Sequence, residues 1–146
     1  PGIVSEEFLI ADLVVDPAVN GVQSYEATDF LMNARIIDAS SQLILWQAGA
    51  LGDWTYRRGA YDLRALPLLV EKLLTFYPPD HQVVVYEAAI FPGCAPVINP
   101  VCLRELAGAH LSAACTLYLA PSRPATPDTR YANRLLSQKA QADAAR

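Results

Sequence analysis

Four segments stand out along this chain, at residues 21–29, 43–49, 83–89 and 112–121, and the last three combine an apolar run with small residues. The segments at residues 42–47, 82–87 and 116–119 are apolar on consecutive positions and rich in β-branched or aromatic side chains, as expected for strands covered on both faces. Each of the first two leads directly into small residues, and the third follows Ser112-Ala-Ala-Cys115. Small residues leave the backbone open to a ligand, so this repeated pattern is the best indication of function in the sequence.

Helical patterns separate these strands. Ser5 followed by two glutamates predicts a capped helix that Asp16-Pro17 stops, and residues 22–25 fit a short strand before a helix over 26–32. Apolar spacing predicts a helix over 63–77 with Pro67 in its first turn, and another over 101–106. We expect residues 50–61 to form a loop. The alternation predicts an α/β fold, specifically an α+β two-layer sandwich with a mixed sheet of about four to five strands covered by helices.

The composition narrows the class of protein. The chain has 146 residues, 53% of them hydrophobic and 18% charged, which suits one globular domain. No stretch approaches the roughly 18 apolar residues of a membrane span. The net charge of −4 and the lack of a basic stripe argue against nucleic acid. The region from Ser122 onward is charged and has few apolar anchors, so we predict one domain over residues 1–121 and a tail over 122–146, loosely held at least in its last residues and helical at 130–138.

The cysteines and the N-terminal residues indicate the cellular compartment of the protein. Cys94, Cys102 and Cys115 are widely spaced with only two histidines in the chain, which argues against a zinc site and favours buried free thiols. The first residues carry neither a basic segment nor an apolar signal core. Together these features predict a cytoplasmic protein. The start at Pro1-Gly2 without Met is a hint of truncation, not a proof of it.

Polar residues at the strand ends are the main candidates for chemistry. Gln47 and Glu87 occupy equivalent points after their strands, and each could belong to a functional site or cap backbone N–H groups of a neighbouring loop. We interpret Glu26 and Asp29 as a solvated helix face, and His81 and His110 as surface residues. No nucleophile elbow, phosphate-binding glycine loop or His-Glu-x-x-His helix is present.

An aromatic and basic cluster in the predicted loop is a further candidate. It consists of Trp54, Tyr56, Arg57, Arg58 and Tyr61. Such a cluster can grip a flat or anionic substrate, or it can simply pack a long loop. Both interpretations stay open on the sequence alone.

Several motifs resemble the tetrapyrrole methylase superfamily of S-adenosylmethionine-dependent methyltransferases. Pro1-Gly-Ile-Val-Ser5 resembles its interdomain segment, and Leu43-Ile-Leu-Trp-Gln-Ala-Gly49 resembles a strand that usually ends in Tyr-Met-Gly. Residues 83–89 and 112–119 resemble the two later strands that line the cofactor pocket. Tyr25-Glu-Ala-Thr-Asp-Phe-Leu31 and Tyr86-Glu-Ala-Ala89 most resemble the branch of borosin peptide backbone N-methyltransferases.

The resemblance implies a role for the chain and for individual residues. It covers the second, C-terminal domain of the family, whereas the N-terminal half with its Gly-x-Gly-Pro-Gly strand end is absent from this sequence. S-adenosyl-L-methionine would be the methyl donor. The acceptor would be either a peptide backbone, which we favour slightly, or a small molecule such as a tetrapyrrole-like macrocycle. The residues implied to bind the cofactor are Ser5, Gln47, Ala48, Ala88, Ala89 and Ala114; no catalytic residue and no metal ligand is implied. Val4 and Gln47 depart from the residues usual at their positions.

Partners follow from the same resemblance. The implied partners are the N-terminal methylase domain of the same protein, the methyl acceptor, and a second copy in a homodimer. Two alternatives remain: a non-catalytic dimerisation or partner-binding module that keeps the fold, and a distinct α/β fold with accidental motif similarity.

Overall fold

A five-stranded mixed sheet forms the centre of the molecule. The computed structural model describes residues 5–53, 55, 61–91 and 93–144. The strands are β1 (Val22–Glu26), β2 (Gln42–Trp46), β3 (Gln82–Glu87), β4 (Val97–Cys102) and β5 (Thr116–Leu119), in the order β1-β2-β5-β3-β4. β1 and β2 are parallel, and every other neighbouring pair is antiparallel. The predicted α+β class with a mixed sheet of about five strands is therefore confirmed.

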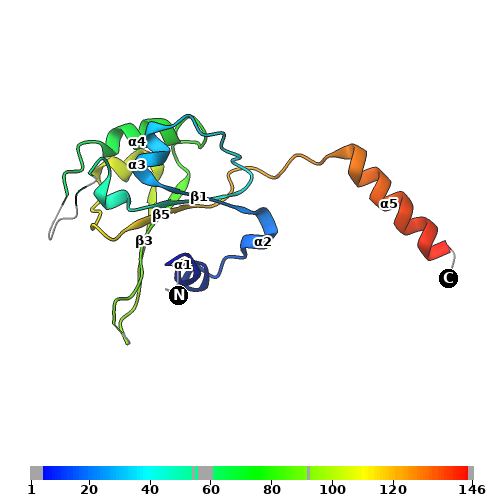
Figure 1. Cartoon of the computed structure of the whole chain (residues 1–146), viewed down its shortest axis with the longest axis horizontal. Helices are drawn as coiled ribbons and strands as arrows, with labels where there is room; N and C mark the ends of the chain where they lie inside the picture. Colours follow the sequence, from blue (N-terminus) through cyan, green and yellow to red (C-terminus); the bar gives the residue numbers. More distant parts are fainter. Residues whose placement is uncertain (1–4, 54, 56–60, 92, 145–146) are drawn as a thin grey trace.

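Helices cover the two faces of the sheet unequally. One face carries α3 (Ala27–Met32), α4 (Leu66–Leu73) and two 3₁₀ helices, η1 (Ala48–Ala50) and η2 (Leu103–Gly108). The opposite face carries α1 (Ser5–Leu13), which leads through α2 (Pro17–Asn20) to β1. Figure 1 shows α3 and α4 above the sheet and α1 below it. The arrangement is a two-layer sandwich with one additional helix on its second face.

Side chains of the central strands alternate between two hydrophobic cores. Leu43 and Leu45 of β2 belong to the larger core, with α4 residues such as Leu69 and Leu73, whereas Ile44 belongs to a smaller core around Leu9 of α1. All six side chains are fully buried. Coverage on both faces therefore explains why β2 is apolar at consecutive positions.

A hydrogen bond anchors α1 to the sheet. The hydroxyl of the buried Tyr86 in β3 donates to Asp12 Oδ2 at 2.7 Å. Burial, and then the hydrogen bond to the Asp12 carboxylate and its charge, raise the pKa of Tyr86. The phenol therefore stays protonated and keeps donating across the neutral pH range.

The helix boundaries differ in part from the sequence prediction. α4 spans only Leu66–Leu73 of the predicted 63–77, with Pro67 in its first turn as expected. Asp16-Pro17 does follow the end of α1, but Pro17 also begins α2, because Asp16 accepts a hydrogen bond from Ala18 N at 2.8 Å and caps the new turn.

The predicted helix at residues 101–106 is wrong in its first two positions. Val101 and Cys102 complete β4, and η2 starts only at Leu103. The sequence did not predict β4, since Pro100 and Asn99 are poor strand residues. β4 tolerates Pro100 because it is an edge strand that pairs only with β3.

The C-terminal helix stands apart from the sheet. α5 (Thr129–Ala144) includes the predicted helical piece at 130–138 and is longer than expected. Figure 1 shows it connected to β5 by an extended segment and directed away from the core. None of the side chains described in α5 is buried.

Candidate functional site

The ends of three strands meet at one edge of the sheet. β2 and β3 are both antiparallel to β5, so they run parallel to each other and to β1. Leu45 pairs with Leu117 and Tyr86 with Thr116, so continuing each register places Gln47, two residues after Leu45, and Glu87, one residue after Tyr86, on the two sides of Cys115. Their backbones are about 10 Å apart, or two strand spacings. The sequence prediction that they occupy equivalent positions therefore holds.

Gln47 has an unusual backbone conformation. Its φ of 56° and ψ of 33° lie in the left-handed region, which costs a non-glycine residue about 1 to 3 kcal/mol. Its side chain is exposed and makes no hydrogen bond to the part of the chain that the structure describes. It therefore does not cap a neighbouring described loop. Strained residues of this kind cluster at functional sites.

Gly49 lies against the turn that precedes β5. A Cβ atom on Gly49 would be 1.6 Å from the Ser112 carbonyl oxygen, so only glycine fits. Next to this contact, Ala48 N donates to the Cys115 carbonyl at 3.2 Å, and Cys115 N donates to the Ser112 carbonyl at 3.2 Å. The backbone after β2 thus packs directly on the backbone before β5.

Glu87 joins the same turn from β3. Its half-buried carboxylate accepts a hydrogen bond from the Ser112 hydroxyl. The expected alternative, in which Glu87 caps backbone N–H groups, is replaced by this side-chain contact. Neither Ser112 nor Gly49 is among the residues predicted to bind the cofactor, because their contact joins segments 63 positions apart.

Cys115 lies between these residues as an unreactive thiol. Burial, and to a smaller extent the negative charge of Glu87, raise the pKa of Cys115 to about 12. The group is therefore protonated at neutral pH and is a poor nucleophile. Of the three cysteines, only Cys115 is buried; Cys102 is half-buried and Cys94 exposed. The expectation of buried thiols thus holds for one of them.

The residues predicted to bind a cofactor differ in exposure. Ala89, Ala114, Gln47 and Ser5 are exposed, Ala88 is half-buried beside the smaller core, and the Ala48 side chain is fully buried. Gln47, Ala48, Ala88, Ala89 and Ala114 all belong to the edge formed by the ends of β2 and β3 and the start of β5.

The first turn of α1, which begins at Ser5, contacts β1 and through it the end of β2. The neighbouring residue, Glu6, accepts a hydrogen bond from the Ser24 hydroxyl of β1 at 3.3 Å. Ser24 Oγ in turn accepts from Trp46 Nε1 at 2.5 Å. The first turn of α1 is therefore linked to the last residue of β2, immediately before Gln47.

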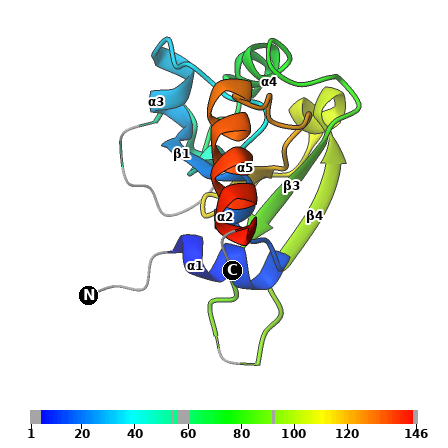
Figure 2. The ribbon, with the colours of Figure 1, turned by 90° about the vertical axis from the view of Figure 1, so that its right-hand side faces the viewer.

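A groove continues from Ala89 along α1. It has a volume of about 420 Å³ and lies between α1 and the connection from β3 to β4, which extends beyond the sheet in Figure 2. Its lining residues are Phe8, Asp12, Ala89, Ile90, Phe91, Gly93, Cys94 and Pro96. Phe8, Ile90 and Phe91 are 48%, 74% and 68% exposed, so much apolar surface here has no cover.

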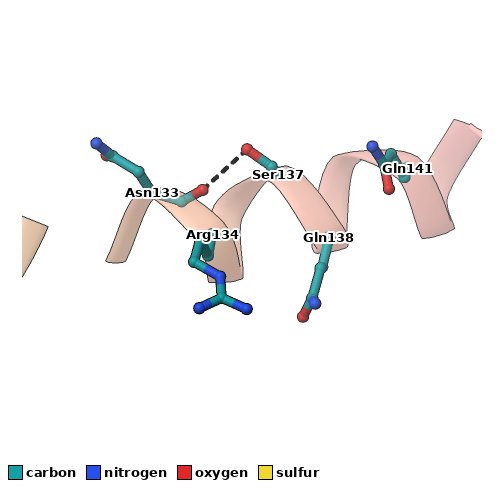
Figure 3. A pocket seen from close by; sticks show the side chains of 5 residues that line it. All are labelled: Asn133, Arg134, Ser137, Gln138 and Gln141. Atoms are coloured by element: carbon teal, nitrogen blue, oxygen red, sulfur yellow. Dashed lines mark hydrogen bonds between the residues drawn. The ribbon is translucent and has the colours of Figure 1, made fainter. Parts of the chain in front are cut away.

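A second hollow lies on α5, away from the strand ends and from α1. Figure 3 shows its lining side chains, Asn133, Arg134, Ser137, Gln138 and Gln141, all from this one helix. Ser137 Oγ donates to the Asn133 carbonyl at 2.9 Å, an ordinary contact within a helix. No other described element lines the hollow, so it is not a candidate site.

The other sequence candidates have structural roles. Glu26 caps α3 by accepting from Asp29 N at 2.7 Å, and Asp29 forms an ion pair with Arg35. His81 contacts the Ala120 carbonyl at 3.0 Å, and His110 is exposed. Of the aromatic and basic cluster, residues 54 and 56–58 lie outside the described residues.

Neither a metal cluster nor a membrane-spanning helix occurs among the described residues. Between residues 5 and 144, with the gaps stated above, no three His, Cys, Asp or Glu side chains are placed to hold a metal ion. No helix in that part of the chain is long and apolar enough to cross a bilayer. The cytoplasmic location stays a prediction.

Sequence comparison relates the chain to known proteins. It is 36% identical over 141 residues to a methyltransferase/ribosomally synthesized cyclic peptide gymnopeptides precursor of Gymnopus fusipes, covering 92% of this chain and 33% of that protein. This chain is similar to part of a methyltransferase–peptide precursor. It is 39% identical over 106 residues to the dendrothelin A precursor of Dendrothele bispora, covering 73% of this chain and 25% of that protein.

The chain spans about a third or less of these relatives. No protein-family model matches it. Among solved structures, a uroporphyrin-III-C-methyltransferase from Thermus thermophilus aligns with a TM-score of 0.42 and 16% identity, over 69% of this chain and 35% of that chain. A structural similarity of this extent carries no conclusion about activity.

Proposed function

We propose that the chain is the second domain of an S-adenosylmethionine-dependent methyltransferase. In this proposal, residues 1–121 form the domain and residues 122–146 form a tail. Its support is the similarity to methyltransferase–peptide precursors over 92% of the chain. The observation that carries it in the structure is the open sheet edge, where Gln47 is strained and exposed next to a row of alanines.

The edge fits one wall of a cofactor site. Ala88, Ala89 and Ala114 have small side chains, and their backbone groups make no hydrogen bond to another described residue outside the strand ladders. Such groups can pair with the edge of an adenine ring. Gln47 offers a side-chain amide that makes no hydrogen bond to the described residues, and Ser5 offers a hydroxyl from α1. The Ala48 side chain is buried, so we assign its contact with the cofactor to the backbone.

The chemistry requires little from this domain beyond placement. S-adenosyl-L-methionine supplies an activated methyl group when bound. The residues at the edge would orient it and exclude water while an acceptor approaches. Any group that polarises or deprotonates the acceptor would belong to the N-terminal methylase domain. We therefore assign no catalytic residue to this chain.

A peptide backbone is the favoured acceptor, ahead of a tetrapyrrole-like molecule. The relatives combine a methyltransferase with a ribosomally synthesized peptide precursor in a single protein. A methyl acceptor carried on the same polypeptide would be presented at high effective concentration. The sheet edge itself does not distinguish the two acceptors, so the preference rests on these relatives.

The partners of this domain would cover the apolar groove beside α1. Phe8, Ile90 and Phe91 would pack against the N-terminal methylase domain or against the second copy in a homodimer. The same exposed surface favours the alternative function, a non-catalytic module that keeps the fold to bind a partner. Cofactor binding separates the two proposals.

Replacing Ala114 tests the cofactor wall. Ala114 is exposed, so Ala114→Leu should fold normally and fill the proposed adenine site. We expect it to weaken S-adenosylhomocysteine binding by at least tenfold in the natural polypeptide that carries this sequence, measured by calorimetry. Ala107→Leu is the matched control, since Ala107 is exposed on η2 at the opposite end of the sheet. Equal affinities for the two variants would contradict the assignment.

A further inference from the structure

We propose that Glu87 is a positioning residue for the cofactor wall. By accepting the hydrogen bond from Ser112, its carboxylate fixes the turn over residues 112–115, whose tip carries Ala113 and Ala114. The inference rests on the proposed function and adds to it a residue that makes no predicted cofactor contact of its own.

The turn is attached at three points. The Ser112 carbonyl lies against Gly49, and the Cys115 carbonyl accepts from Ala48 N. These two contacts are made by backbone atoms and hold the turn to the end of β2. The third contact, from the Ser112 hydroxyl to Glu87, holds it to the end of β3. Only this third contact depends on a side chain that can be exchanged without altering the backbone.

The tip of the turn has no anchor of its own. Leu111 and Cys115 are buried on either side of it, with 5% and 1% of their surface exposed. Ala113 and Ala114, between them, are exposed and have no polar side-chain group. The position of their backbone N–H and C=O groups therefore depends on how firmly Ser112 is held.

A carboxylate suits this task. Hydrogen bonds to a charged acceptor are roughly twice as strong as those between neutral groups. A half-buried carboxylate also needs a donor, and Ser112 provides the only one for Glu87 among the described residues. Both partners therefore favour one geometry of the turn. A glutamine at position 87 would keep an acceptor oxygen of the same reach.

Affinity measurements on four variants test the proposal. In the natural polypeptide, we expect Ser112→Ala and Glu87→Leu each to weaken S-adenosylhomocysteine binding about tenfold. The double variant should be no weaker than the worse single one, because both remove one interaction. Glu87→Gln should restore binding to within about threefold of wild type. Ser122→Ala is the control, since its hydroxyl donates to the Ala39 carbonyl at 3.4 Å, away from the turn. Wild-type affinity in all variants would overturn the proposal.

Hydrogen exchange separates this proposal from the proposed function. We expect amide exchange at residues 113–115 to be about tenfold faster in Ser112→Ala and Glu87→Leu than in wild type and Ser122→Ala. If the wild-type polypeptide does not bind S-adenosylhomocysteine, the proposed function fails. Amide hydrogen exchange still measures how firmly the turn is held. Unchanged exchange at the turn would overturn the positioning role whatever the binding result.

Discussion

Gly49 is the residue on which the geometry of the sheet edge depends most directly. Its hydrogen atoms are all that separates the end of β2 from the Ser112 carbonyl. A glycine after a strand can be recognised in the sequence, but the close approach cannot, because it depends on how β5 returns beside β2. The sequence therefore predicted the location of the edge and missed the contact that shapes it.

Replacing Gly49 by alanine should disrupt this contact. The new Cβ would lie 1.6 Å from a backbone oxygen, so the backbone must move, and we expect a loss of about 3 kcal/mol or more in the free energy of unfolding. Urea denaturation measures it. Gly108→Ala is the control, since nothing lies within 4 Å of a Cβ there. Similar denaturation midpoints for the two variants would contradict the packing described here.

Tyr77 offers the opposite test, in which removing a side-chain group should increase the stability of the fold. Its hydroxyl is buried and has no hydrogen-bond partner in the described structure. Burial, and then the charge of Asp38, raise its pKa to about 12. We expect Tyr77→Phe to raise the free energy of unfolding by about 1 kcal/mol at pH 7, because an unsatisfied buried polar group is costly.

The pH dependence of the same variant gives a second measurement. A raised pKa means that the unfolded state loses its proton first, so this tyrosine lowers stability as the pH rises from about 10 towards 12. The advantage of Tyr77→Phe should therefore grow over that interval. A variant less stable than wild type at pH 7 would show that the hydroxyl has a partner, and an advantage that does not grow in alkali would show that the pKa of Tyr77 is not raised.

Secondary structure elements were predictable where one local signal dominated. The apolar runs of β2, β3 and β5 and the amphipathic α4 follow from sequence pattern. β4 could not be predicted in this way, because Pro100 and the exposed Val97 and Ile98 give no strand pattern. Its strand structure comes from pairing with β3. Local propensity predicts elements that pack on both faces better than it predicts an edge strand.

α5 should contribute nothing to the stability of the sheet. Its large apolar side chains, Tyr131, Leu135 and Leu136, are 60%, 68% and 65% exposed. Helices in proteins take most of their stability from tertiary packing, and no described side chain of α5 is buried. We expect deletion of residues 124–146 to leave the thermal midpoint unchanged within about 2 °C and to remove helical signal in circular dichroism. A large drop in the midpoint would mean that α5 packs on the domain in solution.

At the scale of the whole molecule, the two faces and the edge of the sheet have different roles. The face under α3 and α4 is a closed core, whereas the groove beside α1 leaves Ile90 and Phe91 open. The edge between them carries Gln47, Ala89 and Ala114. A domain that ends in an open edge beside an apolar groove suits a shared cleft with a second domain better than a self-contained enzyme.

Calorimetric titration of S-adenosylhomocysteine is the most direct test of that account. It should be done with the natural polypeptide that carries this sequence and, in parallel, with residues 1–146 alone. We predict micromolar binding to the natural polypeptide if it contains the preceding domain, and none to the 146-residue chain, because the cleft needs both walls. Absence of binding to a polypeptide that contains both domains would contradict the account and favour the non-catalytic partner-binding module.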